Sequence, residues 1–281
     1  MITALKTLLA PAEVDSNSYH SRDELACGQL LKAGVYTPGT NGGEDDESRW
    51  HPYKMNEPTV VTPEMELGTI THAMYYEPDS VPKYVARPMK NGKAVKSNSA
   101  EYATFRLDNP GCIILHPNQI DNAKAMVASV TRSREAGVMA KYVRTTSVIS
   151  TEQGYVSKLC GRAVRFKPDR IRVRHGDGLV IIEDLKTSAE IYPHEWRWHA
   201  QKLGYFRRAA FYIDALRAII GDEYEIVYRF VVVQSSAPHL VAVYQSSEAR
   251  VADGRAENEA ALNALAHVDS EPVWLREVYE I

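Results

Sequence analysis

Two short segments near the middle of the chain, residues 169–174 and 179–186, constrain the fold most strongly. Both have the composition of β-strands, and the dipeptide Asp177-Gly178 between them is a strong hairpin signal. A two-residue turn and a four-residue loop give pairing registers that differ by two residues, so the same side chains share a face of the hairpin in both cases. A three-residue loop would shift the register by one residue and place these side chains on opposite faces. The sequence therefore predicts an antiparallel hairpin in one of two registers.

Three charged side chains fall on one face of this hairpin. With the shorter turn Asp169 lies opposite Lys186, and with the longer loop Asp169 lies opposite Asp184. Glu183 points to the other face in both registers, which favours Asp184 over its neighbour as the acid that works with Asp169. The pattern predicts two carboxylates and a lysine side by side.

Two carboxylates beside a lysine are the elements of a metal-dependent phosphodiesterase. Carboxylates bind Mg²⁺, the ion polarises a phosphodiester and activates a water, and a lysine can position that water or stabilise charge on the phosphate. The alternative is a cross-strand ion pair without chemistry, which contributes about 0–1 kcal/mol if exposed. The apolar run at 179–182 favours chemistry, because acids at the end of a buried strand are costly unless a cation pairs them.

A helix predicted over residues 194–220 follows the hairpin. It carries Gln201 and Tyr205, which are four residues apart and share a helix face. This face either points back at the acids and holds a water or phosphate, or is the partly buried side of an ordinary amphipathic helix.

The other predicted elements form one domain over residues 1–281. Their order indicates an α/β or α+β fold, in which a central sheet is surrounded by helices. A Gly- and Pro-rich acidic stretch at 38–58 predicts a flexible loop without an assigned role. The other predicted helices cover 64–76, 118–134 with a further piece to about 142, and 248–267, and the other predicted strands cover 146–149, 155–164, 225–234 and 239–244.

Charge and composition describe an ordinary globular protein with one basic segment. The net charge is −3, yet residues 158–208 contain twelve Lys/Arg and six Asp/Glu. This segment is either a phosphate-binding surface or a solvated, charged hairpin and helix. Three separated cysteines without a CxxC pair argue against a zinc or iron–sulfur cluster. With neither a long apolar stretch nor a secretion signal in the sequence, we expect a cytoplasmic protein.

Six short motifs occur in a characteristic order along the chain. They are Asn17-Ser-Tyr-His20, the segment 67–78 with His72 and Glu77-Pro78, Gly161-Arg162, Lys167-Pro-Asp-Arg170, Glu183-Asp-Leu-Lys-Thr187 and Gln201-x-x-x-Tyr205. Together they resemble the PD-(D/E)XK nuclease superfamily and, within it, the RecE-type exonuclease family (exodeoxyribonuclease VIII), with a more distant likeness to lambda exonuclease. The resemblance covers about residues 15–275 and implies a restriction-endonuclease-like core with a central mixed β-sheet flanked by helices.

The resemblance implies a metal site and a catalytic lysine. Asp169, Asp184 and His72 would be metal ligands, together with the carbonyl of Leu185. Lys186 would orient or activate the attacking water. For His72 the residues alone favour an ordinary helix histidine, and only the resemblance makes it a ligand.

Supporting roles follow from the same resemblance. Glu152 would be a catalytic acid that completes or supports the metal site, and Gln201 and Tyr205 would support the site or hold a phosphate. Three arginines are candidates for contact with DNA phosphates, with exposed strand faces as the alternative: Arg162, Arg165 and Arg170.

The activity implied by the resemblance is degradation of linear double-stranded DNA. The family works with Mg²⁺, for which Mn²⁺ can substitute, and digests one strand 5′→3′ to leave 3′ single strands for phage-type recombination. Its members form rings, here a homotetramer, and cooperate with a RecT-like single-strand annealing protein. One departure is that no aromatic or basic wedge for strand separation can be placed in this sequence.

Three other functions compete with this one. The chain could be an endonuclease of the same superfamily, or a non-catalytic DNA-binding protein that kept the fold. A glycosidase also uses paired carboxylates, but the lysine two residues after Asp184 and the basic segment favour phosphate over sugar. The complete set of Asp169, Asp184 and Lys186 argues for catalysis.

Overall fold

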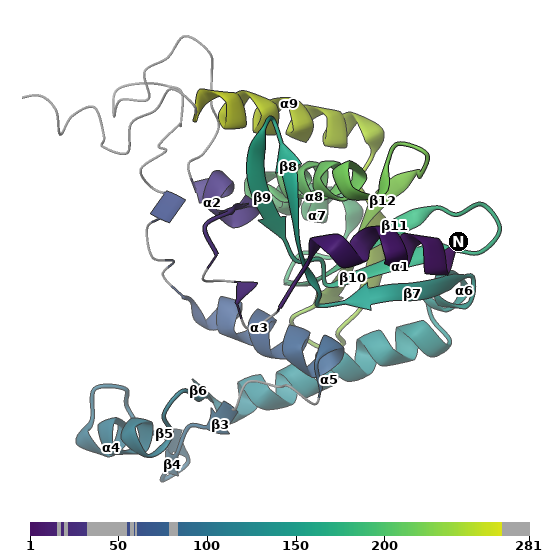
Figure 1. Cartoon of the computed structure of the whole chain (residues 1–281). Helices are drawn as coiled ribbons and strands as arrows, with labels where there is room; N and C mark the ends of the chain where they lie inside the picture. The colour runs from purple at the N-terminus through teal and green to yellow at the C-terminus, as the bar shows by residue number, and fades with distance from the viewer. Residues whose placement is uncertain are drawn as a thin grey trace, which may run out of the picture.

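The computed structural model describes most of the chain (Figure 1). The acidic stretch predicted as a loop, residues 38–58, lies outside the described residues except for 55 and 56. The described residues are 1–15, 18–19, 22–32, 55–56, 59, 61–78 and 84–265.

A five-stranded mixed sheet forms the centre of the molecule (Figure 1). Its order is β13 (Val241–Gln245), β12 (Ile226–Gln234), β11 (Val180–Ser188), β10 (Arg170–Arg174) and β7 (Thr146–Thr151). β11 and β12 pair in parallel, and the other neighbours pair antiparallel. The predicted fold class, a mixed sheet flanked by helices, is confirmed.

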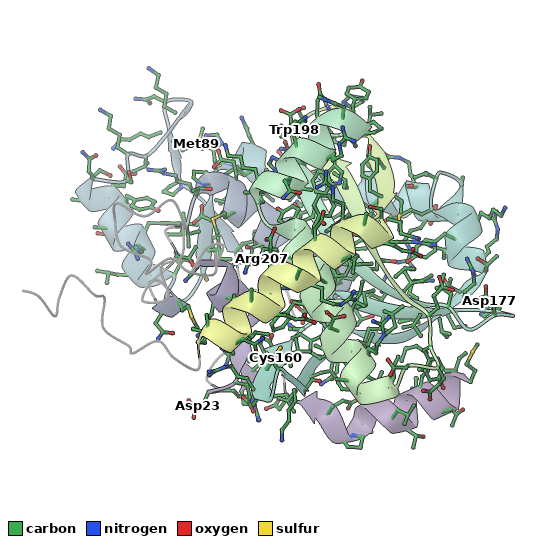
Figure 2. The ribbon with its side chains drawn as sticks, turned by 90° about the horizontal axis from the view of Figure 1, so that it is seen from above. Asp23, Met89, Cys160, Asp177, Trp198 and Arg207 are labelled. Atoms are coloured by element: carbon green, nitrogen blue, oxygen red, sulfur yellow. The ribbon has the colours of Figure 1, made fainter. Side chains whose placement is uncertain are left out.

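The hairpin of β10 and β11 has the longer of the two predicted loops. Arg170 pairs with Glu183, and the amide of Arg174 donates to the carbonyl of Leu179 over 2.8 Å. Residues 175–178 therefore form a four-residue loop, with Asp177 at the edge of the molecule (Figure 2). This register places position 169 directly opposite position 184.

A second sheet lies beside the first. Its order is β1 (Glu13–Val14), β8 (Gly154–Leu159), β9 (Arg162–Phe166) and β2 (Leu25–Ala26). The single strand predicted over 155–164 was wrong, because the chain reverses at Cys160-Gly161. Both residues have positive φ, 48° and 74°, as in tight hairpin turns.

Helices cover both faces of the central sheet. α8 (Tyr205–Ile220) packs on the face that carries Ile182 and Phe230. α3 (Pro63–Tyr76) and α5 (Pro117–Glu135) contribute to the apolar cluster on the face of Leu185 and Val231. The elements not yet named are α1 (Ile2–Leu9), η1 (Ala10–Ala12), α2 (Cys27–Lys32), β3 (Tyr84–Ala86), β4 (Met89–Lys90), β5 (Lys93–Ala94), α4 (Ala100–Asp108), β6 (Ile113–Leu115), α6 (Ala140–Arg144), α7 (Pro193–Lys202) and α9 (Glu248–Ala264).

The helix predicted over 194–220 is two helices, α7 and α8. The chain breaks at Gly204, whose φ of 67° lies in the left-handed region that glycine adopts without a steric penalty. Gln201 ends up in α7 and Tyr205 at the start of α8, so the shared helix face predicted for them was wrong. Within the described part of the chain, no helix is both long and apolar enough to cross a membrane.

The α8–α9 contact brings two helix backbones unusually close. Arg207 of α8 is buried beside the middle of α9 (Figure 2), where its Nε donates to Asn258 Oδ1 over 3.2 Å. Asn258 Nδ2 donates in return to the Arg207 carbonyl over 2.8 Å. A Cβ at Gly254 of α9 would lie 2.7 Å from the Phe206 carbonyl oxygen, so the packing requires glycine there.

Two glycine substitutions test this packing. Gly254→Ala is expected to destabilise the protein by about 1–3 kcal/mol, because the new methyl group meets backbone atoms that cannot move aside. Gly28→Ala in α2 is the matched control, since a Cβ there meets nothing within 4 Å and alanine favours the helix by up to about 1 kcal/mol. Urea unfolding measures both. Equal stability of the two variants would contradict the close α8–α9 contact.

Candidate metal centre

One histidine and two acids meet at the end of the central sheet. His72 Nε2 lies 3.0 Å from Asp169 Oδ2 and 3.1 Å from Glu152 Oε1. One ligand atom of each of the three residues lies within 4.8 Å of the others. The side chains come from three separate parts of the chain, so the cluster exists only in the folded protein.

Backbone geometry fixes the two acids of this cluster. Glu152 lies between β7 and β8 with a φ of 50°, a left-handed conformation that is uncommon for a residue with a Cβ. Its amide donates to the Asp169 carbonyl over 3.0 Å, which ties the start of β10 to the turn. Such conformations persist where the surrounding structure holds them, and they concentrate at functional sites.

His72 is delivered by α3. The Thr62 side chain caps this helix by accepting from the Met65 amide, and Pro63 starts its first turn. Gly68, one turn before His72, faces β11, where a Cβ would come within 3.2 Å of Thr187 Oγ1. The small residue therefore lets α3 approach the strand that carries Asp184.

Asp184 and Lys186 form a second group beside the first. Lys186 Nζ lies 2.5 Å from Asp184 Oδ2, and both side chains are largely buried. The same Nζ lies 5.2 Å from the centre of the Tyr205 ring. The predicted common face of Asp184 and Lys186 is present, while the Asp184 carboxylate contacts the lysine and is not a member of the group of three whose ligand atoms lie within 4.8 Å of one another.

Lys167 is a member of the site that the sequence did not reveal. Its Nζ lies 2.9 Å from Glu152 Oε2. In the sequence it belongs to the motif Lys167-Pro-Asp-Arg170, from which no role for the lysine itself was predicted. The available signal was its place two residues before Asp169, which puts it next to the carboxylates once the strand ends meet.

The acids raise the pKa of His72 and the burial raises that of Glu152. Burial alone would lower the pKa of His72, but Asp169 and Glu152 outweigh it and raise this pKa to about 9. Burial and the nearby Asp169 raise the pKa of Glu152 to about 7, against the opposing effects of His72 and Lys167. The metal-free site thus holds a protonated histidine near neutral pH.

Asp169 and Asp184 shift in opposite directions. Burial would raise the pKa of Asp169, but the charges of His72 and Lys186 and the hydrogen bond from the Leu185 amide lower this pKa overall. For Asp184, burial and Asp169 outweigh Lys186 and leave the pKa raised. The two carboxylates therefore differ in their affinity for a proton, although they occupy opposing strand positions.

The other predicted site residues are placed as follows. Leu185 meets Asp169 through its amide, which donates to Oδ2 over 2.7 Å, and the ligand role of its carbonyl stays a prediction. Gln201 is exposed and accepts from Arg250 Nη1 over 3.4 Å. Tyr205 alone of the predicted Gln201–Tyr205 pair lies against the lysine of the site.

Two of the three candidate phosphate-contacting arginines are buried. Arg170 Nη1 lies 3.3 Å from Glu183 Oε1, and Arg165 donates to the Arg22 carbonyl. A guanidinium with such partners inside the protein is poorly placed for a DNA backbone, which argues against direct phosphate contact, and the DNA-binding role of Arg165 and Arg170 stays a prediction. Arg162 is partly exposed on β9, and its role stays a prediction.

The donors fit a divalent cation. Carboxylate oxygens are the ligands that Mg²⁺ and Mn²⁺ prefer, and imidazole nitrogen binds transition metals such as Mn²⁺. His72, Glu152 and Asp169 would hold the ion, and Glu152 is the acid for which the resemblance predicted a role in completing or supporting the site. The ligand role of Asp184 stays a prediction.

Comparisons with known proteins bear on the fold. A family model described as a PDDEXK-like domain of unknown function (DUF3799) matches residues 47–276. The crystal structure of a protein from Eubacterium rectale, named as a presumed exonuclease, matches with a TM-score of 0.55 at 13% identity, over 90% of this chain and 85% of that chain. A second structure, SSO0001, matches over 72% of this chain and 76% of that chain at 11% identity, and its TM-score of 0.27 is too low to indicate a shared fold. No curated protein matches the chain.

Binding of Mn²⁺ is expected to release at least one proton near neutral pH. His72 is protonated there and must free its Nε2 to bind an ion. Affinity should therefore increase as the pH rises toward about 9, the pKa of His72. Calorimetric titration in buffers of different ionisation enthalpy measures the released proton, and His72→Gln should release less. A binding enthalpy that is the same in all buffers would refute the protonated histidine.

Proposed function

We propose that this chain, which belongs to the family of PDDEXK-like domains of unknown function (DUF3799), is a metal-dependent nuclease that degrades linear double-stranded DNA from its ends. The observation that carries the proposal is the cluster of His72, Glu152 and Asp169 beside the Asp184–Lys186 pair. The fold of the presumed exonuclease from Eubacterium rectale supports it.

The residues of the site divide the work. His72, Glu152 and Asp169 would hold the cation, which when bound would polarise the scissile phosphodiester and lower the pKa of a water molecule. Lys186 lies on β11, two residues after Asp184, and its ammonium would stabilise negative charge on the phosphate or orient the water. Asp184 holds that ammonium in place.

The direction and the biological role extend the proposal. We assign 5′→3′ digestion that leaves 3′ single strands for homologous recombination, a ring-shaped homotetramer, and a single-strand annealing protein as partner. The likeness of the motifs to the RecE-type exonuclease family supports these points. A ring would also accommodate an acidic protein around DNA, since the basic side chains could line its inner surface.

Single substitutions distinguish catalysis from DNA binding without chemistry. Lys186→Ala is expected to lower the cleavage rate by about 100-fold or more while Mn²⁺ binding is retained, because the lysine touches Asp184 and not the three-residue cluster. Asp169→Asn should abolish both cleavage and Mn²⁺ binding. Arg106→Ala on α4, away from the site, is the control. If Lys186→Ala and Asp169→Asn both cut at the rate of the parent and the control, the site is not catalytic.

Labelled DNA separates the proposed exonuclease from an endonuclease. With Mg²⁺, a linear duplex labelled at the 5′ end should lose its label early as short products, whereas a 3′ label should stay on long strands. A covalently closed circle should remain intact, because an enzyme that starts at ends finds none. Early release of the 3′ label would reverse the direction, and cutting of the circle would favour the endonuclease.

A further inference from the structure

Glu183 is a fully buried acid on the face of β11 opposite Asp184, and three groups bind its carboxylate. Tyr76 donates to Oε1 over 3.0 Å and Tyr142 donates to Oε2 over 2.6 Å. Arg170 Nη1 lies 3.3 Å from Oε1. A buried carboxylate with this many partners is costly to disturb, because removal of a partner leaves charge without compensation.

Tyr76 connects this buried acid to the metal centre. It lies on α3 one turn after His72, and the two rings are 4.9 Å apart. The Arg170 guanidinium also lies 4.6 Å from the Tyr76 ring centre. The last turn of α3 is thereby held to β10, which begins directly after Asp169, and to β11, which carries Asp184.

Tyr142 makes the same kind of bond from a different place. It lies on α6, which carries none of the site residues, and it packs against Arg172 and Arg229, whose guanidinium carbons are 5.3 Å and 5.0 Å from its ring centre. One carboxylate therefore accepts one tyrosine hydroxyl on each oxygen, and only one of these tyrosines belongs to the helix that delivers His72.

We propose that Glu183 is a positioning residue that acts through Tyr76: it fixes the last turn of α3 so that His72 Nε2 stays within reach of Asp169 and Glu152. Two sets of contacts support this role. Glu183 binds Tyr76 of α3 on one face of β11, and His72 of the same helix contacts Glu152 and Asp169 at the strand ends. The inference rests on the proposed function for the identity of the ion, and on geometry for the rest.

Tyr76→Phe and Tyr142→Phe form a matched pair of variants. Each removes one hydroxyl from the same carboxylate and keeps the ring, so both should lower the melting temperature to a similar degree. Mn²⁺ affinity, measured by calorimetry without DNA, should fall about tenfold for Tyr76→Phe, as when an outer partner of a metal ligand is lost. It should change less than twofold for Tyr142→Phe. Equal affinities of the two variants would overturn the proposal.

A second measurement does not depend on a metal. In the metal-free protein labelled with ¹⁵N-histidine, the Nε2 proton of His72 lies between two carboxylates and should exchange slowly with water. Tyr76→Phe should speed this exchange, and Tyr142→Phe should leave it unchanged. If the parent neither binds Mn²⁺ nor cuts DNA, the proposed function fails while this difference still decides the role of Glu183. The same exchange rate in both variants rejects the role.

Discussion

Burial of four carboxylates at one end of the sheet is the constraint on which the rest of the structure depends. An isolated ionised acid is too costly to bury, so each of the four needs a cationic partner nearby. The structure supplies a different cation to each acid, and the sequence spreads these cations over a helix, a loop and two strands. The pairs are Glu152 with Lys167, Asp169 with His72, Glu183 with Arg170, and Asp184 with Lys186.

The pairs serve two different purposes on the two sides of β11. Glu183 and Arg170 are enclosed among tyrosines and hold α3 against the sheet. The other three acids lie at the strand ends, where His72 bridges two of them and where a metal ion could replace its proton. The alternation of side chains along β11 therefore places Glu183, a structural acid, and its immediate neighbour Asp184 on opposite faces of the sheet.

Sequence patterns predicted the part of the site that depends on local geometry. Strand alternation placed Asp184 and Lys186 together and Glu183 on the opposite face, and the four-residue loop was one of the two registers considered. The contact of His72 with Asp169 depends on how α3 packs across the sheet, which periodicity does not encode. The break at Gly204 was missed because a glycine inside an apolar helical pattern is often tolerated, and only φ decides whether the helix continues.

The basic segment shows why charge counts alone could not locate a DNA-binding surface. Four of its eight arginines do not belong to a solvated face, since Arg165, Arg170, Arg172 and Arg207 are buried in the fold. Inside the protein they form ion pairs with acids, pack against aromatic rings and donate hydrogen bonds to backbone carbonyls. The pairs Arg170–Glu183 and Lys186–Asp184 lie within the segment and leave its excess of positive charge unchanged, whereas Lys167 pairs with Glu152 and Arg207 with Glu257, two acids outside it. Part of the excess is therefore compensated within the protein itself before any DNA phosphate is considered. The basic residues left for DNA must then be sought among those with exposed side chains.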